Sequence, residues 1–223
     1  VLEATSKVGV TSEDVKNYIA QYKDIAKDNM RQHGIPSSIT MAQGILESGA
    51  GTGVLSMKAN NHFGIKCHTG WTGESVHHDD DAAQECFRKY DHPGESYRDH
   101  SLFLTSRSRY ANLFKLDKGD YVAWAKGLKA AGYATDPKYP DKLISLIERY
   151  ELFRLDEEVI GSGYKAIAKV SELPLDSKSY RVAQGDTLYS ISRKFNLSVD
   201  QLIEMNNLSS NAISIGQILK IKS

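Results

Sequence analysis

A single glutamate near the end of an apolar helix is the residue in this sequence best placed for acid chemistry. Apolar residues repeat at helical spacing before it: Ile39, Ala42, Ile45 and Leu46. Pro36 suits a first helical turn and Gly49 suits a helix end, so Glu47 lies in the last turn. The negative end of the helix dipole and the apolar neighbours both raise the pKa of a carboxyl group.

A carboxylic acid that stays protonated near neutral pH can protonate a leaving oxygen, which is the task of the acid in a glycosidase. An ordinary solvated glutamate near a helix end is the alternative interpretation. The residues around Glu47 and the composition of the chain have to decide between a catalytic acid and a solvated glutamate.

The composition is that of a soluble globular protein. The 223 residues are enough for one good-sized domain and a small one, and 40% are hydrophobic and 25% charged. The 28 basic and 28 acidic residues cancel, so we expect no nucleic-acid partner. No apolar run is long enough to span a membrane. The chain begins at Val1 without a signal-like segment, which fits a processed chain that was exported.

Helical periodicity covers most of the first 155 residues. Besides the helix that ends near Glu47, the pattern predicts helices from about Ser12 to Gln32, Glu95 to Thr105, Asp120 to Ala131 and Asp141 to Tyr150. Between Phe63 and Tyr90 the aromatic and β-branched residues predict two or three short antiparallel strands. The sequence therefore indicates an α+β domain, mainly helical, with a small β lobe.

The two cysteines lie in segments that we interpret as strands. Cys67 ends one of them and Cys86 lies in the other. If these strands pair, a disulfide would close a loop of about 20 residues, contribute roughly 3 kcal/mol and imply an oxidising compartment. Two free buried thiols are the alternative, and a zinc pair fits the spacing poorly.

A linker and a small second domain follow. Residues 156–178 contain glycines and a proline typical of a linker. Residues 179–223 show the order β, α, α, β, with Thr187 as a helix cap and Ser198 opening a second helix. The expected domains are therefore 1–155 and 179–223.

The second domain resembles a LysM module. The resemblance lies in Tyr180-Arg181-Val182-Ala183-Gln184-Gly185-Asp186-Thr187-Leu188-Tyr189-Ser190-Ile191-Ser192, in Leu202-Ile203-Glu204-Met205-Asn206-Asn207-Leu208 and in Ile215-Gly216-Gln217-Ile218-Leu219. It implies binding to glycans that contain N-acetylglucosamine, chiefly peptidoglycan or chitin. The groove implied by the family lies between two loops, and its expected contacts here are Gly185, Asp186, Thr187, Asn211 and Ile213.

The first domain resembles glycoside hydrolase family 73, the endo-β-N-acetylglucosaminidases of bacterial peptidoglycan, over residues 12–154. Four blocks carry this resemblance, in order: Ala42-Gln43-Gly44-Ile45-Leu46-Glu47-Ser48-Gly49, Asn60-Asn61-His62-Phe63-Gly64-Ile65-Lys66, Phe87-Arg88-Lys89-Tyr90 and Gly132-Tyr133-Ala134-Thr135-Asp136-Pro137-Lys138-Tyr139. The resemblance implies a lysozyme-like fold with a cleft between two lobes. It makes Glu47 the general acid, Tyr133 a catalytic tyrosine, and Asn61, Phe63 and Tyr139 substrate contacts.

The partner of Glu47 is harder to assign. The family pattern places a glutamate nine residues after a glycine, and that count from Gly73 reaches Ala82, beside an acidic run. We therefore expect Asp80, or its neighbour Asp81, to serve, since Asp80 alternates with Val76 on one strand face. A separation of about 5 Å from Glu47 would favour retention, and about 6.5–9.5 Å would favour inversion. The 2-acetamido group of the substrate is the other possible assistant.

Two further groups in the β lobe have alternative interpretations. Trp71 suits a sugar platform, or it packs on the lobe as a hairpin tip. His77 and His78 precede the aspartate run, with His62 and His68 nearby, and such a cluster could hold zinc or calcium. Solvated hairpin residues explain the same cluster, and the expected chemistry needs no metal or other cofactor.

The sequence thus predicts a hydrolase of the cell envelope that cleaves the β-1,4 bond after N-acetylglucosamine in peptidoglycan, acting as a monomer in the periplasm, in the envelope or outside the cell. An N-acetylmuramidase or a lytic transglycosylase would keep the fold and change the product. The alternative from another functional class is a protein that binds the cell wall without cleaving it.

Overall fold

The computed structural model describes residues 9–78, 84–169, 178–183, 185–208, 210–213 and 216–222. The chain divides into two compact units after Ile167. Among the helices in these ranges, none is long and apolar enough to cross a membrane. Each unit is described by itself below.

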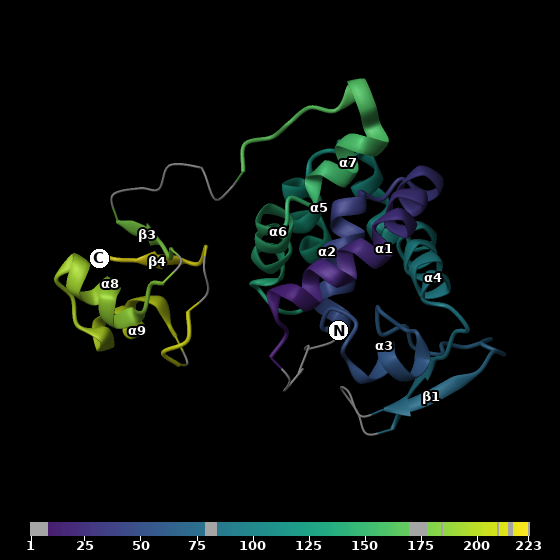
Figure 1. Ribbon diagram of the computed structural model, residues 1–223, viewed down its shortest axis with the longest axis horizontal. Helices are drawn as coiled ribbons and strands as arrows, with labels where there is room; N and C mark the ends of the chain where they lie inside the picture. The colour runs from purple at the N-terminus through teal and green to yellow at the C-terminus, as the bar shows by residue number, and fades with distance from the viewer. Residues whose placement is uncertain are drawn as a thin grey trace. The chain divides into compact units, whose positions relative to one another are not determined.

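The first unit is mainly helical, which confirms the predicted fold class. Its elements are α1 (Ser12–His33), α2 (Ser37–Ser48), α3 (Val54–Ala59), β1 (Ser75–His78), β2 (Glu85–Arg88), α4 (Pro93–Ser106), η1 (Ser108–Lys115), α5 (Tyr121–Ala130), α6 (Tyr139–Arg149), α7 (Phe153–Ile160) and η2 (Gly161–Gly163). Figure 1 shows the helices packed together with the hairpin at their edge. The short 3-10 helix η1 was not predicted, because its single turns give no long periodicity.

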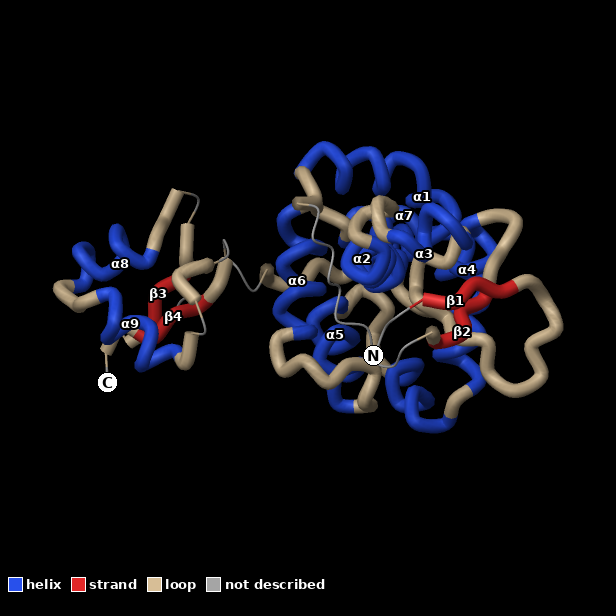
Figure 2. The backbone as a smooth tube through the Cα atoms, turned by 90° about the horizontal axis from the view of Figure 1, so that it is seen from below, coloured by secondary structure: helices blue, strands red, loops and turns tan. Residues whose placement is uncertain are grey.

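Helix α2 lies in the centre of this unit. Figure 2 shows it surrounded by other helices, and it contacts α1, α3, α5, α6 and α7. All its residues from Ser37 to Ile45 are buried, because the sequence of α2 carries no charged side chain before Glu47. The helix ends as predicted at Gly49, which adopts the left-handed conformation (φ 57°) and donates its N–H to Ile45 O.

The N-terminus of α2 is capped from another helix. Pro36 occupies the cap position and provides no side-chain hydrogen bond. Asp156 of α7 replaces such a cap, since its carboxylate accepts hydrogen bonds from the Ser38 N–H at 2.8 Å and from the Ser38 hydroxyl. The structure therefore places residues 156–163, the first part of the expected linker, in α7 and η2, because Asp156 and the packing of α7 tie them to α2.

The β lobe is a two-stranded hairpin with a covalent link to the preceding loop. Strands β1 and β2 pair antiparallel with Val76 opposite Phe87. Cys67 and Cys86 form a disulfide with Cα atoms 5.5 Å apart. The strand expected at 63–67 is reduced to one bridge between Lys66 and Phe87. Asn61 explains where the ladder stops, because its Oδ1 accepts the Ile65 N–H and its Nδ2 donates to the Arg88 carbonyl, so its amide stands between these two backbone groups.

The second unit has the predicted βααβ order. Its elements are β3 (Ser179–Arg181), α8 (Leu188–Phe195), α9 (Val199–Asn206) and β4 (Ile218–Lys220), and β3 pairs antiparallel with β4. Thr187 and Ser198 form capping boxes at the starts of α8 and α9. A small core holds the unit together, consisting of Val182, Leu188, Ile191, Leu202, Leu219 and Ile221.

Candidate active site

Glu47 lies in the last turn of α2, where its side chain is half-buried. Two hydrogen bonds to Ser48 hold the turn after Glu47 against the helix end. The Ser48 hydroxyl accepts the Gly51 N–H at 2.8 Å, and the Ser48 carbonyl accepts the Gly53 N–H at 2.9 Å. A side chain at position 53 would meet the Ser48 carbonyl at 2.8 Å, which explains the glycine there. The backbone around Glu47 is therefore fixed on both sides.

Tyr139 contacts the Glu47 carboxyl group directly. It begins α6, and its hydroxyl lies 3.1 Å from Glu47 Oε1 and 2.9 Å from Gln43 Nε2. Gln43 and Glu47 are one turn apart on the same face of α2, so one phenol can bridge both. Tyr139 is only 4% exposed, and its predicted role as a substrate contact stays a prediction.

Tyr133 lies beside this pair. Its ring stacks on Tyr139 with centroids 5.7 Å apart, and its side chain is half-buried. Burial, and then the negative charge of Glu47, raise the pKa of both Tyr133 and Tyr139 well above the ordinary value. Both phenols therefore keep their hydrogen at neutral pH and can donate it.

A chain of buried hydrogen bonds supports α2 on the side of α1 and α4. The Tyr97 hydroxyl donates to the Tyr18 hydroxyl at 2.7 Å, and Tyr18 lies 2.8 Å from His62 Nδ1. Gly44 makes room for them, because a Cβ there would meet the Tyr18 hydroxyl at 2.7 Å and the Tyr97 hydroxyl at 3.0 Å. Burial lowers the pKa of His62 to about 4, so this imidazole is neutral at pH 7.

His100 lies buried under the aromatic residues of the site. Its ring stacks on Phe63 at 4.1 Å and meets the Tyr133 ring edge at 6.2 Å. Neither ring nitrogen has a hydrogen-bond partner among the described residues. Burial lowers the pKa of His100 to about 3, which keeps it neutral.

Two expected substrate contacts are buried. Asn61 is 1% exposed and uses its amide on the backbone of Ile65 and Arg88, at 2.9 Å each. Phe63 is buried between His100 and Tyr97. Their contact with substrate stays a prediction.

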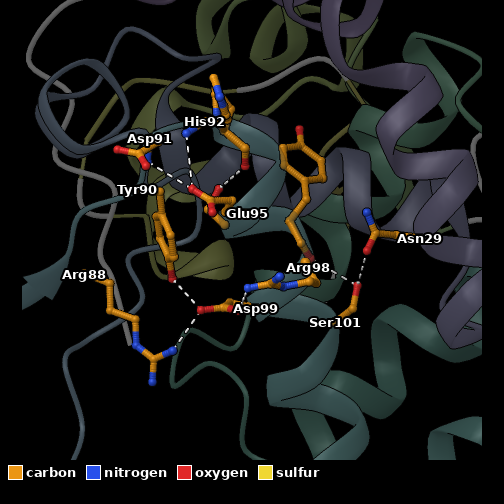
Figure 3. Close-up of polar contacts among 12 residues, drawn as sticks. Asn29, Arg88, Tyr90, Asp91, His92, Glu95, Arg98, Asp99 and Ser101 are labelled. Atoms are coloured by element: carbon orange, nitrogen blue, oxygen red, sulfur yellow. Dashed lines mark hydrogen bonds and ion pairs between the residues drawn. The ribbon is translucent and has the colours of Figure 1, made fainter. Parts of the chain in front are cut away.

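Trp71 is held against the β lobe by Arg88. The guanidinium lies 4.4 Å from the indole centroid, and the indole N–H donates to Glu74 O at 3.0 Å. Its side chain is half-buried, and its role as a sugar platform stays a prediction. Figure 3 shows Arg88 and Tyr90 reaching Asp99 of α4, at 2.8 and 3.1 Å. Arg88 therefore joins the β lobe to the helices.

Asp136 has local partners. Its carboxylate accepts the Lys138 N–H and forms an ion pair with Lys142, at 2.8 and 2.7 Å. These contacts hold the loop that carries Tyr133 onto α6. The ion pair links the loop to the same helix that Tyr139 begins, so Asp136 helps to place both tyrosines.

The expected second carboxylates, Asp80 and Asp81, lie outside the described residues, which leave out 79–83. Their distance from Glu47 therefore stays a prediction. Across the ranges that are described, no cluster of three or more His, Cys, Asp or Glu residues could hold a metal ion. The nearby acidic residues Glu74 and Glu85 form ion pairs with Lys89 and Lys66.

In the second unit the predicted glycan contacts lie on two loops. Gly185 has a positive φ of 88°, and a Cβ there would meet open space. Asp186 accepts the Ala183 N–H and the Tyr180 hydroxyl, and these bonds lower its pKa. Thr187 caps α8, so both side chains shape the loop. Asn211 is exposed, whereas Ile213 packs partly on the core.

Sequence reasoning missed Gln43, His100 and Asp156. Gln43 carried a usable signal, since a polar residue one turn before Glu47 on an otherwise apolar helix needs a buried partner. Asp156 and His100 carried none, because their partners are distant in the sequence.

The comparisons with known proteins agree with this geometry. Residues 23–152 match the Glucosaminidase family, described as mannosyl-glycoprotein endo-beta-N-acetylglucosaminidase, and residues 180–222 match the LysM domain. Exo-glucosaminidase LytG of Bacillus subtilis is 39% identical over 138 residues, which cover 57% of this chain and 48% of LytG. An autolysin of Enterococcus faecalis is 32% identical over 230 residues, which cover 92% of this chain and 30% of the autolysin.

A solved structure shares the fold of the first unit. The glycoside hydrolase domain of Salmonella typhimurium FlgJ aligns with a TM-score of 0.53 and 31% identity, over 65% of this chain and 92% of that domain. This chain spans about half or less of the two curated relatives. The family match covers Glu47, Tyr133 and Tyr139, and the chain therefore belongs to the glucosaminidase family, with a LysM domain following its lysozyme-like unit.

Proposed function

We propose that this protein hydrolyses peptidoglycan at the β-1,4 bond after N-acetylglucosamine, with Glu47 as the general acid. The observation that carries the proposal is the placement of Glu47: a half-buried carboxyl group at a fixed helix end, bonded by Tyr139 on Oε1 and flanked by Tyr133. Family membership supports the same bond type, and the name of LytG, an exo-glucosaminidase, supports the same sugar.

The proton of Glu47 passes to the glycosidic oxygen as the bond from that oxygen to C1 breaks. Positive charge then develops at C1 of the N-acetylglucosamine residue. Asp80, or Asp81, would stabilise that charge or activate the water that adds to C1, and the 2-acetamido oxygen of the substrate is the alternative assistant. The leaving sugar takes the proton from Glu47, and the water proton restores the acid.

The position of cleavage along the strand is part of the proposal. The matched family is described as endo-acting, whereas LytG is named an exo-glucosaminidase. We propose endo action for this chain. Endo action releases long fragments early in a digest, whereas exo action releases single units from the start, so the size of early products distinguishes them.

The LysM domain would hold the same substrate. Gly185, Asp186 and Thr187 on one loop and Asn211 and Ile213 on the other are the proposed contacts. Binding by a tethered module raises the local concentration of glycan at the active site. The protein would act as a monomer, in the cell envelope or outside the cell. The disulfide of Cys67 and Cys86 supports this location, because such bonds persist in oxidising compartments.

The first experiment compares the parent with Glu47→Gln on purified cell walls. We expect the variant to lose at least about 100-fold in kcat, since general acids contribute 10²–10⁴. The exposed Glu13→Gln serves as the matched control and should clear walls at the parental rate. Equal clearing by Glu47→Gln would disprove the assigned acid, and an inactive parent would favour a wall-binding protein.

Mass spectrometry of the released muropeptides tests the bond that is cut. The proposal requires reducing ends of N-acetylglucosamine. Muramic reducing ends would identify an N-acetylmuramidase, and anhydromuramic ends a lytic transglycosylase. Either result would replace the proposed specificity and leave Glu47 as the acid.

A further inference from the structure

Gln43 is the one polar side chain that α2 buries against the hydroxyl of Tyr139. It is completely buried, and its Nε2 lies 2.9 Å from the Tyr139 hydroxyl. The same hydroxyl lies 3.1 Å from Glu47 Oε1. The three groups form a short chain of hydrogen bonds from the helix interior to the reacting carboxyl group. In this chain each hydrogen bond has a defined donor and acceptor.

The direction follows from the chemistry of the three groups. An amide nitrogen only donates, so the Tyr139 oxygen accepts from Gln43. The single hydroxyl hydrogen of Tyr139 is then directed to Oε1 of Glu47. A carboxylic acid has one proton, and the oxygen that accepts a hydrogen bond from the phenol is the carbonyl oxygen. The acidic proton therefore resides on the other oxygen, Oε2.

We propose that Gln43 is a positioning residue for the glycosidase reaction: by donating to Tyr139, it keeps the acidic proton of Glu47 on Oε2. This proposal rests on the proposed function, in which Glu47 is the acid. If the chain ran the other way, Glu47 would donate to Tyr139 through Oε1, and the proton would point into the protein instead of toward a substrate.

Two substitutions at Gln43 alter this chain of hydrogen bonds to different degrees. Gln43→Met keeps the volume and removes the donor, so the Tyr139 oxygen becomes free to accept the proton of Glu47. Gln43→Glu is nearly isosteric and replaces the donor by an acceptor, which draws the Tyr139 hydrogen away from Glu47 and reverses the chain. We expect kcat to fall about 10-fold for Gln43→Met and about 100-fold for Gln43→Glu, within the range of a general acid, with KM within about twofold of the parent.

The pH profile provides a readout that a merely structural role would not move. Tyr139 donates to Glu47 in the parent, which favours the ionised carboxylate. Without the donor from Gln43, this bond weakens, and we expect the alkaline limb of the kcat profile to move to higher pH in Gln43→Met. Thr40→Val is the matched control, because Thr40 is fully buried on the same helix and its hydroxyl has no partner among the described residues. It should change neither kcat nor the profile.

A double-mutant cycle with Tyr139→Phe completes the test. In that background Gln43→Met should cost nothing more, because the bridging hydroxyl is gone. An additive loss, or parental kcat and pH profile in both Gln43 variants of an active enzyme, would overturn the positioning role and leave the proposed function intact. A parent without glycosidase activity would overturn both. If Gln43→Glu does not fold, the cycle with Gln43→Met gives the answer alone.

Discussion

The end of α2 and the β hairpin are held in opposite ways. Side chains of α6 and α7 bond α2 directly, through Tyr139 to Gln43 and Asp156 to Ser38, and the Tyr18–Tyr97 bond between α1 and α4 packs against Gly44 of α2. The hairpin instead has a half-exposed β1 and relies on partly exposed ion pairs and one disulfide. The proposed acid therefore lies on a helix held by buried hydrogen bonds, whereas partly exposed ion pairs and a disulfide hold the hairpin.

This difference has a physical cause. A buried hydrogen bond is costly to break, because each partner is left without water, whereas an exposed ion pair contributes at most about 1 kcal/mol. The hairpin buries few side chains. Its disulfide therefore provides a constraint that side-chain packing provides elsewhere. Three further experiments test this contrast between α2 and the hairpin.

The largest effect is expected at the cap of α2. Asp156→Ala leaves the N–H and hydroxyl of Ser38 buried without an acceptor and should lower the free energy of unfolding by about 3 kcal/mol. Urea unfolding measures it, with the exposed neighbour Glu157→Ala as control. A loss no larger than that of the control would show that α2 is not fixed from α7.

The same variant has a pH signature. Burial raises the pKa of Asp156 to about 7, from 3.8, so the folded protein binds more protons than the unfolded chain between these values. The stability that this group contributes is present below pH 3.8 and is lost as the pH rises through 7. The destabilisation by Asp156→Ala should therefore be larger at pH 5 than at pH 8.

The second effect is local to the hairpin. Replacing Cys67 and Cys86 by serine opens a loop whose ends are 19 residues apart, worth about 3 kcal/mol in the chain-entropy model. Because β1 is half-exposed, we expect the loss to appear as faster amide hydrogen exchange in 67–88, with protection in α2 unchanged. Equal loss of protection in α2 would contradict the contrast between the two regions.

The smallest effect concerns His100, a buried base that lacks a partner among the described residues. His100→Phe keeps the stack on Phe63 and should raise stability by about 1 kcal/mol at pH 8. The pKa of His100 is lowered from 6.5 to about 3, so the parent loses stability as the pH falls below 6.5. The gain should therefore grow at pH 5. The exposed His77→Phe should show no such growth, and thermal unfolding at both pH values measures the pair.

The elements that were predicted correctly are those whose pattern is local. The apolar periodicity of α2 and its stop at Gly49 placed Glu47 in a last helical turn, and the capping residues Thr187 and Ser198 located α8 and α9. The strand expected at 63–67 is reduced to one bridge because the Asn61 amide takes the Ile65 N–H and the Arg88 carbonyl, which a longer ladder would join. Strand propensity does not include such a competitor.

The sequence by itself determined the family, the fold class and the position of Glu47, since these depend on residue types at fixed spacing. Only the tertiary structure decided that Tyr139 rather than solvent meets Oε1, that Gln43 lies behind it, and that Asp156 caps α2 from 118 residues away. Hydrogen bonds between distant segments depend on how helices pack, and packing is not encoded in any one stretch of the chain.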